Sequence, residues 1–352
     1  EKATCRYLFF PGCRLGASDP RYIIDAYEKL LVLEPGTGLM TGCCGTPAHW
    51  AGEEKQHGEI LEEIQNRWAA LGKPELIFAC PTCRQLFKRN LPNIEGKFLY
   101  ALFPEPDEKR LRETAGSPEE KPVCVFDPCA SRNEAELQQA VRKHVQAAGF
   151  KLEPLPLEKA LAQCCSWGGQ ISIASPGYAR EIARSRASQR PHPYVTYCVN
   201  CRDIFAAADK PIYHILDILL KINGPDRHPP TWTEQQNNRV LLKRQALKQF
   251  WNEEPEMEPK NRKTGVTLYI PETVKADLNR KRILEADMQS VVDHCETTGK
   301  KILDPQTGIF SGHLKIGHMT FWSQYRPKDN AAEALAFELV NGYGHRMEIV
   351  EE

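Results

Sequence analysis

The stretches GCCGTPAHW, residues 42–50, and CPTCR, residues 80–84, contain an adjacent pair of cysteines and a CxxC motif. A lone cysteine precedes them, and the same order occurs again further along the chain, with like positions 116 to 121 residues apart. These two copies hold ten of the 13 cysteines: Cys13, Cys43, Cys44, Cys80 and Cys83 in the first, and Cys129, Cys164, Cys165, Cys198 and Cys201 in the second. A repeat at this distance indicates that a whole structural unit has been duplicated.

Five cysteines per copy are one more than the common metal centres use. Structural zinc takes four ligands, and an ordinary cubane iron–sulfur cluster takes four cysteines. The fifth is therefore either a separate reactive thiol or a ligand of an unusual centre. Adjacent side chains point to opposite faces of a strand, so we expect both cysteine pairs in loops or at helix starts. Neighbouring glycines permit such backbone paths: Gly42 and Gly45 in the first copy, Gly168 and Gly169 in the second.

The cysteine motifs and their flanks resemble the paired cysteine-rich (CCG) domains typified by the B subunit of heterodisulfide reductase. The resemblance covers about residues 5 to 222 and is carried by FFPGCRLGA (9–17), GCCGTPAHW, CPTCR, FDPCASR (126–132), CCSWGGQ (164–170) and CVNCRDIF (198–205). It implies a noncubane [4Fe-4S] cluster in each copy, bound through all five cysteines, so that the ten cysteines are the cofactor-binding and metal-ligating residues. No catalytic residue is identified. The sequence departs from the family motif after the second pair, where Ser166 and Trp167 replace the usual glycine.

The composition is that of an ordinary globular protein, with 41% hydrophobic and 26% charged residues among 352. The formal net charge is zero, so there is no electrostatic case for nucleic acid or an anionic membrane as a partner. Because no apolar run of 18 residues and no signal-like N-terminus occurs, we expect no membrane span and a cytoplasmic protein. In that setting the cysteine motifs favour metal or redox chemistry over disulfides. Since the chain begins at Glu1 rather than methionine, we expect a processed product or part of a longer polypeptide.

Strand-like and helix-like stretches alternate in both copies, which predicts an α/β fold with two pseudo-symmetric repeats and parallel sheets. Ligands at such sheets collect beyond the carboxyl ends of the strands, where the cysteines stand. The expected elements of the first copy are strands 5–10 and 75–79 and helices 21–33 and 53–71. Those of the second copy are strands 123–126 and 194–197 and helices 134–148 and 178–189.

The composition changes at NGPDRHPP, residues 223–230, which marks a boundary. We expect four segments: a first cluster-binding repeat at 1–118, a second at 119–223, a linker with an amphipathic helix at 224–264, and a small α+β interaction domain at 265–352. The linker helix, expected at 234–251, packs either on its own domain or on another subunit. The last segment is expected to contain one helix at 274–298 and an antiparallel sheet with strands at 317–326, 334–340 and 345–351.

Several residues outside the cysteine motifs have two possible roles. Trp50 and Trp167 either shield the centres from water or pack as plain core. The arginines that follow cysteines, Arg14, Arg84, Arg132 and Arg202, either stabilise anionic sulfur or lie on the solvated surface. Asp127 is expected to have a structural turn role rather than to deliver protons. Cys5 and Cys124 are expected in the core, and Cys295 is expected to be an ordinary thiol.

Three functions remain open. The first is an oxidoreductase subunit that resembles the heterodisulfide reductase B subunit, acts within a multi-subunit complex of anaerobic metabolism, and passes electrons to a disulfide. The second is an electron relay in a flavin-containing dehydrogenase complex, and the third is a zinc-bound scaffold. The sequence has no phosphate-binding loop or dinucleotide fingerprint. The resemblance to a subunit that needs an electron donor implies a flavin-bearing or ferredoxin-like partner.

Overall fold

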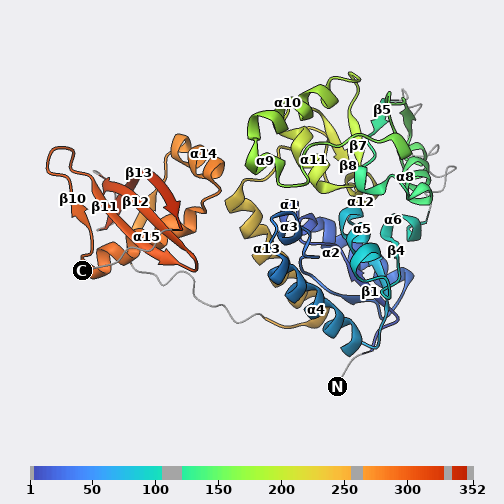
Figure 1. Ribbon diagram of the computed structural model, residues 1–352, viewed down its shortest axis with the longest axis horizontal. Helices are drawn as coiled ribbons and strands as arrows, with labels where there is room; N and C mark the ends of the chain where they lie inside the picture. The colour runs from blue at the N-terminus through green and yellow to red at the C-terminus, as the bar shows by residue number, and fades with distance from the viewer. Residues whose placement is uncertain (1–3, 105–120, 255–264, 329–334, 347–352) are drawn as a thin grey trace. The chain divides into compact units, whose positions relative to one another are not determined.

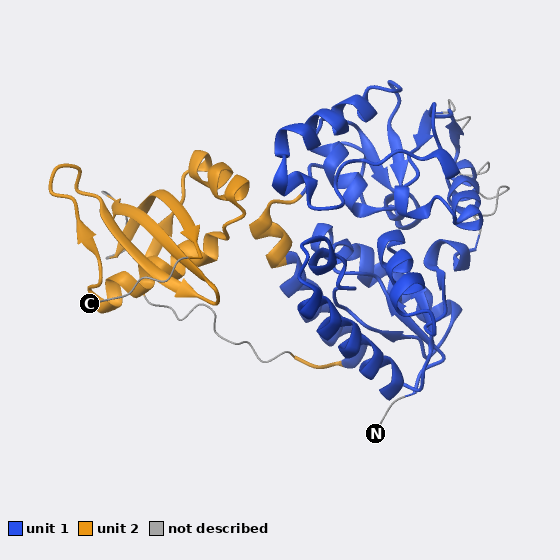
Figure 2. Ribbon diagram, in the orientation of Figure 1, with its two compact units in different colours: residues 1–229, 238–251 blue, residues 230–237, 252–352 orange. Residues whose placement is uncertain are grey.

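The computed structural model describes residues 4–104, 121–254, 265–328 and 335–346 (Figure 1). The chain forms two compact units: residues 1–229 with 238–251, and residues 230–237 with 252–352 (Figure 2). Both cysteine-containing copies lie in the first unit. Across the described ranges, no helix is long and apolar enough to cross a membrane.

The first copy is a four-stranded parallel sheet in the order β2-β1-β3-β4. The apolar run YLFF of β1 is buried along its whole length, as expected for a central strand with helices on both faces. The strands are β1 (Tyr7–Phe10), β2 (Gly38–Leu39), β3 (Glu75–Phe78) and β4 (Gly96–Phe98), and the helices are α1 (Leu15–Ser18), α2 (Arg21–Leu33), α3 (Thr46–Trp50), α4 (Glu54–Ala70), α5 (Pro81–Asn90) and α6 (Leu99–Leu102).

The second copy repeats this plan, with a parallel sheet in the order β6-β5-β7-β8. Its strands are β5 (Lys121–Val125), β6 (Phe150–Leu152), β7 (Tyr194–Thr196) and β8 (Ile212–His214). The helical segments are η1 (Cys129–Ser131), α8 (Ala135–Ala147), η2 (Lys159–Leu161), α9 (Ile171–Ala174), α10 (Pro176–Ala187), α11 (Val199–Ala206) and α12 (Ile215–Leu220). The predicted fold class, two like α/β repeats with parallel sheets, is confirmed.

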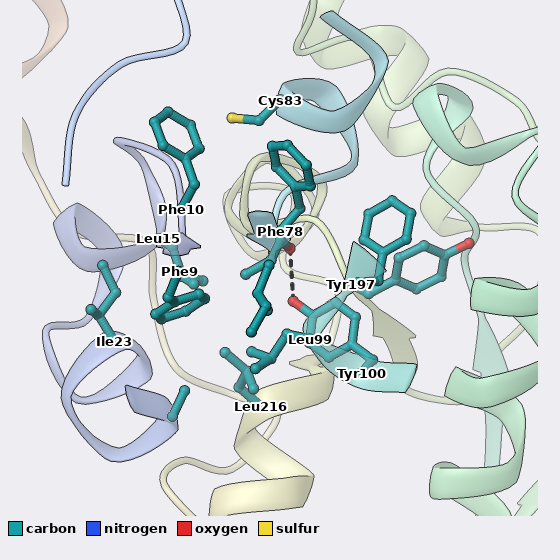
Figure 3. Close-up of a cluster of buried hydrophobic side chains, with 14 of the residues drawn as sticks. Phe9, Phe10, Leu15, Ile23, Phe78, Cys83, Leu99, Tyr100, Tyr197 and Leu216 are labelled. Atoms are coloured by element: carbon teal, nitrogen blue, oxygen red, sulfur yellow. Dashed lines mark hydrogen bonds between the residues drawn. The ribbon is translucent and has the colours of Figure 1, made fainter. Parts of the chain in front are cut away.

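One apolar core runs through both copies. Its buried side chains include Phe9 and Phe78 from the first copy and Tyr197 and Leu216 from the second (Figure 3). Tyr100 is fully buried and donates a hydrogen bond to the carbonyl of Ala79, the residue before Cys80, at 2.9 Å. The two copies therefore fold as one body, and the strand end that carries Cys80 is fixed from within the core.

The helix after the second copy, α13 (Trp232–Ala246), continues into the π-helical turn Leu247–Trp251. Leu242 and Ala246 are buried in the core of the first unit. The ring of Phe250 contacts that of Tyr27 with centroids 4.8 Å apart. Of the two roles considered for this helix, packing on its own domain is the one observed for residues 238–251.

The second unit carries a five-stranded sheet in the order β10-β11-β12-β13-β9. Its elements are β9 (Thr267–Tyr269), α14 (Glu272–Lys281), α15 (Glu285–Thr298), β10 (Ile302–Leu303), β11 (Phe310–Ile316), β12 (Met319–Pro327) and β13 (Ala336–His345). The sheet is mixed rather than purely antiparallel, because β9 pairs parallel with β13. A parallel pair needs a long crossover, and the helices lie between these strands in the chain.

The single helix expected at 274–298 is wrong. Arg282 adopts the left-handed conformation with φ +60°, which ends α14, and Leu284 is extended, so a second helix starts at Glu285. Strands β12 and β13 confirm the strand character expected at 317–326 and 334–340. Of the strand expected at 345–351, residues 347–351 lie outside the described residues.

Candidate metal centres

The lone and CxxC cysteines follow the carboxyl ends of central strands, as expected. Cys13 comes after β1 and Cys80 after β3, and these strands are parallel neighbours. Cys80 is also the extended residue immediately before α5, and Cys198 has the same place before α11. Each CxxC motif is therefore a strand end followed by the first turn of a helix, where free backbone N–H groups and the helix dipole favour anionic sulfur.

The structure gathers the ten cysteines into two groups of five. In each group the thiols follow one another as hydrogen-bonding neighbours, in the orders Cys13, Cys43, Cys44, Cys83, Cys80 and Cys129, Cys164, Cys165, Cys201, Cys198. The Sγ atoms of Cys165 and Cys201 are 3.2 Å apart. The order is the same in both groups: each hydrogen-bonded pair of cysteines in the first group corresponds by motif position to a hydrogen-bonded pair in the second. Cys5, Cys124 and Cys295 do not belong to either series; Cys124 and Cys295 are fully buried.

In each adjacent pair the thiol of the first cysteine has a strongly lowered pKa and is the one that ionises. Hydrogen bonds from Cys13 and Cys44 lower the pKa of Cys43 to about 3, and bonds from Cys129 and Cys165 lower the pKa of Cys164 to about 2. Backbone N–H groups add to this effect: Gly45 N is 3.4 Å from Cys43 Sγ, and Ser166 N is 3.3 Å from Cys164 Sγ.

In the first series, raised pKa values keep the thiols of Cys13, Cys44 and Cys83 protonated. The hydrogen bond to Cys43 is the main cause that raises the pKa of Cys44 to about 12, and the thiols of Cys44 and Cys80 raise the pKa of Cys83. Cys80 is the exception, since a hydrogen bond from Cys83 lowers its pKa to about 7. Five adjacent sulfurs cannot all ionise without a compensating positive charge. A group of metal cations is the kind of ligand that supplies it.

The backbone at the two pairs has the same conformation despite different residues. Gly45 has φ +89°, and Ser166, which replaces glycine in the second copy, has φ +76°. The hydroxyl of Ser166 donates to the carbonyl of Ala179 at 2.7 Å, which offsets the cost of the left-handed conformation. The departure from the family motif therefore leaves the path of the second pair unchanged.

The two pair-containing loops lie against each other. The rings of Trp50 and Trp167 meet edge to face with centroids 5.9 Å apart. Gln170 donates to the carbonyl of Pro47 at 3.2 Å across the same contact. The tryptophans thus pack between the copies, beside both cysteine pairs. Among the ten cysteines Cys164 is exposed, whereas Cys43 is half-buried, as are Cys13, Cys80 and Cys129.

The arginines near the cysteines divide by role. Arg14 crosses to the second copy, where Nε is 3.2 Å from Asn200 Oδ1 and the guanidinium lies over the ring of Trp167 at 5.5 Å. Arg202 is fully buried and donates to Asp203 and to the carbonyl of Arg227, so its charge is satisfied within the protein, not at the surface.

The remaining charged candidates are also accounted for. The guanidinium of Arg84 lies over the ring of Phe78. Arg132 lies near Cys164 and contributes to lowering its pKa. Asp127 is buried, accepts both guanidinium nitrogens of Arg142 at 3.0 and 2.7 Å, and accepts the hydroxyl of Tyr197 at 2.8 Å. These bonds confirm its structural role.

Sequence reasoning missed one charged residue at the first group. Arg239, on α13, acts electrostatically on Cys13 and Cys43 although it lies more than 150 residues further along the chain. No motif marks it. The one available signal is a difference between the copies, because Gly16 stands where the second copy has Arg132.

The described side chains do not converge on a ready-made site for a single metal ion, since no three His, Cys, Asp or Glu residues there are so placed. The case for metal rests instead on the two grouped series of thiols. Two parallel-sheet domains with clustered thiols define a cysteine-rich protein of metal or redox chemistry. Residues 7–88 and 123–203 each match the family model of the cysteine-rich domain, CCG. No curated protein matches the chain.

The matched ranges include the five thiols of each series and end before β4 and β8, which is consistent with one cysteine-rich (CCG) domain in each copy. Such domains occur in iron–sulfur redox proteins, and the grouped cysteines fit an iron–sulfur or metal-binding role.

Proposed function

We propose that this protein is the iron–sulfur subunit of an oxidoreductase similar to the heterodisulfide reductase B subunit. In this proposal each copy holds one noncubane [4Fe-4S] cluster through its five cysteines, and the subunit passes electrons to a disulfide or related substrate. A flavin-bearing or ferredoxin-like partner in a multi-subunit complex supplies the electrons. The observation that carries the proposal is that the same series of five thiols forms twice, at equivalent ends of two like sheets.

The surroundings of the thiols fit an anionic, sulfur-ligated group. Backbone N–H groups point at the sulfurs of Cys43 and Cys164, and the helices that start after Cys80 and Cys198 direct their N-termini toward the site. Hydrogen bonds to ligand sulfur and helix dipoles both stabilise negative charge. A side chain at Gly12 would place its Cβ 3.0 Å from Cys83 Sγ, so the backbone just before Cys13 lies close to that thiol.

The contact between the copies supports a two-electron reaction. Bound clusters would supply one-electron transfer at each copy. Reduction of a disulfide takes two electrons and two protons and yields two thiols, so two adjacent one-electron centres match its stoichiometry. The Trp50–Trp167 contact brings the two pair-containing loops together, and Cys164 is the one exposed cysteine of the ten.

The cofactor is tested by iron and acid-labile sulfide analysis of anaerobically purified protein. We expect both elements in amounts that match two clusters per chain. Zinc without sulfide would instead establish the scaffold function. Consumption of a low-molecular-weight disulfide with reduced viologen as donor tests the reaction, and a protein with both clusters that consumes no disulfide would be an electron relay.

The number of ligands is tested by changing each cysteine of the first copy to serine in turn. Five-cysteine ligation predicts that all five variants lose or alter the cluster of that copy. A four-cysteine cubane predicts that one of the five changes leaves iron content and spectrum intact, which would refute noncubane ligation.

A further inference from the structure

The two copies differ at the third position after the lone cysteine. The second copy has Arg132 there, and its Nε donates to the carbonyl of Ala162 at 2.8 Å while its charge acts on Cys164. The first copy has Gly16 at the same position. At this position the first copy therefore supplies no cation equivalent to Arg132.

The linker helix α13 occupies the space that a side chain at position 16 would need. A Cβ built on Gly16 would lie 2.5 Å from Cδ2 of Leu242 and 2.7 Å from Cδ1 of Ile23. Four residues before Leu242, Asn238 donates to the carbonyl of Ala17 at 2.9 Å. The helix is thus fixed against α1, the segment that directly follows Cys13.

The residue next to Asn238 is Arg239, which is half-buried and whose charge interacts with Cys13 and Cys43. The groups that act on the sulfur of Cys43 then correspond one to one with those that act on the sulfur of Cys164. Cys43 is acted on by Cys13, Cys44, the N–H of Gly45 and Arg239. Cys164 is acted on by the corresponding set of Cys129, Cys165, the N–H of Ser166 and Arg132.

We propose that α13, which lies outside both CCG domains, completes the first centre by placing Arg239 beside Cys43 in the role that Arg132 has beside Cys164. Gly16 is the residue that lets the helix approach closely enough. The redox consequence rests on the proposed function: a cation beside a centre stabilises its reduced, more negative state, so each arginine raises the reduction potential of its own centre. Arg239 places a positive charge beside the centre and is not one of its ligands.

The test is an EPR-monitored redox titration of the complete protein with Arg239→Gln. We expect one cluster to become harder to reduce by about tenfold in its oxidised-to-reduced ratio, about 59 mV for a one-electron couple, while the other is unchanged. Arg132→Gln is expected to shift the other cluster instead. Arg239→Lys keeps the charge and is expected to keep most of the potential. Lys243→Gln, an exposed charge change on the same helix, is the matched control and is expected to shift neither.

Unchanged potentials in Arg239→Gln, or equal shifts of both clusters, would overturn the proposal. A second variant tests the packing: Gly16→Ala is expected to displace α13 and shift the same cluster as Arg239→Gln, and Leu242→Ala in the same chain is expected to reverse that shift. If Gly16→Ala leaves both potentials unchanged while the chain remains folded, Gly16 is not the residue that admits the helix.

A readout without clusters separates this inference from the proposed function. In cluster-free protein, the labelling rates of Cys43 by an anionic and by a neutral disulfide reagent are compared by mass spectrometry. We expect Arg239→Gln to lower the anionic-to-neutral rate ratio several-fold and Lys243→Gln to leave it unchanged. An unchanged ratio in Arg239→Gln refutes the placement of Arg239, whereas absence of iron and sulfide from the purified protein refutes only the proposed function.

Discussion

The two cysteine-containing copies reach the same arrangement of five thiols by different local means. In the first, glycine supplies the left-handed turn after the cysteine pair; in the second, Ser166 adopts that turn and is held by Ala179. In the second, Arg132 comes from the domain itself; in the first, the cation comes from α13. The comparison teaches that the sulfur positions are the preserved feature, while the residues that support them vary.

The largest expected effect comes from removing one ligand from one copy at a time. Cys43→Ser and Cys164→Ser are each expected to lose one centre and keep the other, because each thiol series is complete within its own copy. Iron analysis should fall by about half in either variant, from two four-iron clusters to one. Loss of all iron in both variants would show that the copies do not assemble independently.

Shortening the chain tests how far each copy depends on the linker. A chain ending at residue 254 keeps every residue of the first unit, so we expect both clusters and weakened binding of a partner complex. A chain ending at residue 223 also loses Leu242 and Ala246 from the core. Because burial of one leucine contributes about 2 kcal/mol, it should be less stable by several kcal/mol and should lose the first centre preferentially.

Urea unfolding and iron per folded chain provide the measurements for these two chains. A chain ending at residue 254 that folds without either cluster would contradict the assignment of all ligands to the first unit. Equal stability and iron content in the two chains would show that α13 does not support the first copy.

The turn after the cysteine pair can be exchanged between the copies. Gly45→Ser places a Cβ 2.9 Å from Nδ1 of His57 at a residue with φ +89°. We expect a loss of about 1–3 kcal/mol in the free energy of unfolding, from the strained conformation and the close contact. Urea unfolding measures it, and a change below 0.5 kcal/mol, about the size of an ordinary surface substitution, would show that the first copy tolerates serine as the second does.

The reverse exchange should have a smaller effect. Ser166→Ala removes the hydrogen bond to Ala179 but keeps the left-handed backbone, so we expect a loss of about 1 kcal/mol. Ser166→Gly loses the same bond but relieves the strain, and should be closer to wild type than Ser166→Ala. If the glycine variant is the less stable of the two, the hydroxyl is not what compensates the turn.

A further difference lies at the ends of β4 and β8, where Phe98 in the first copy corresponds to His214 in the second. Burial, together with Arg202 and Arg227, lowers the pKa of His214 from 6.5 to about 3. Between these pH values the unfolded chain binds a proton that the folded chain does not, so stability falls as pH falls.

The expected slope from His214 is at most about 1.4 kcal/mol per pH unit. His214→Gln removes the titrating group and should flatten the stability profile between pH 6.5 and 4, measured by urea unfolding at each pH. An unchanged profile would show that other groups account for the acid sensitivity. Phe98→Leu in the first copy, which alters no titrating group, is the control and should leave the slope unaltered.

The sequence by itself determined the duplication, the α/β fold of both copies and the ten grouped cysteines. The reason is local: apolar runs such as that of β1 define buried strands, and motif cysteines follow strand ends, which meet at one edge of a parallel sheet. The sequence did not predict the break between α14 and α15, because the residue with the left-handed conformation is Arg282 and no glycine or proline marks the position. Whether clusters bind, and which kind, stays a prediction.

The tertiary structure alone decided which thiols are neighbours, how Ser166 adopts the conformation of a glycine, and that α13 packs against the segment that follows Cys13. These features depend on contacts between residues far apart in the chain, such as Leu242 against Gly16 and Trp50 against Trp167. Periodicity and spacing report on the backbone within one element. They do not indicate which distant side chain fills the space beside a residue without a side chain, because the packing of the whole core determines that choice.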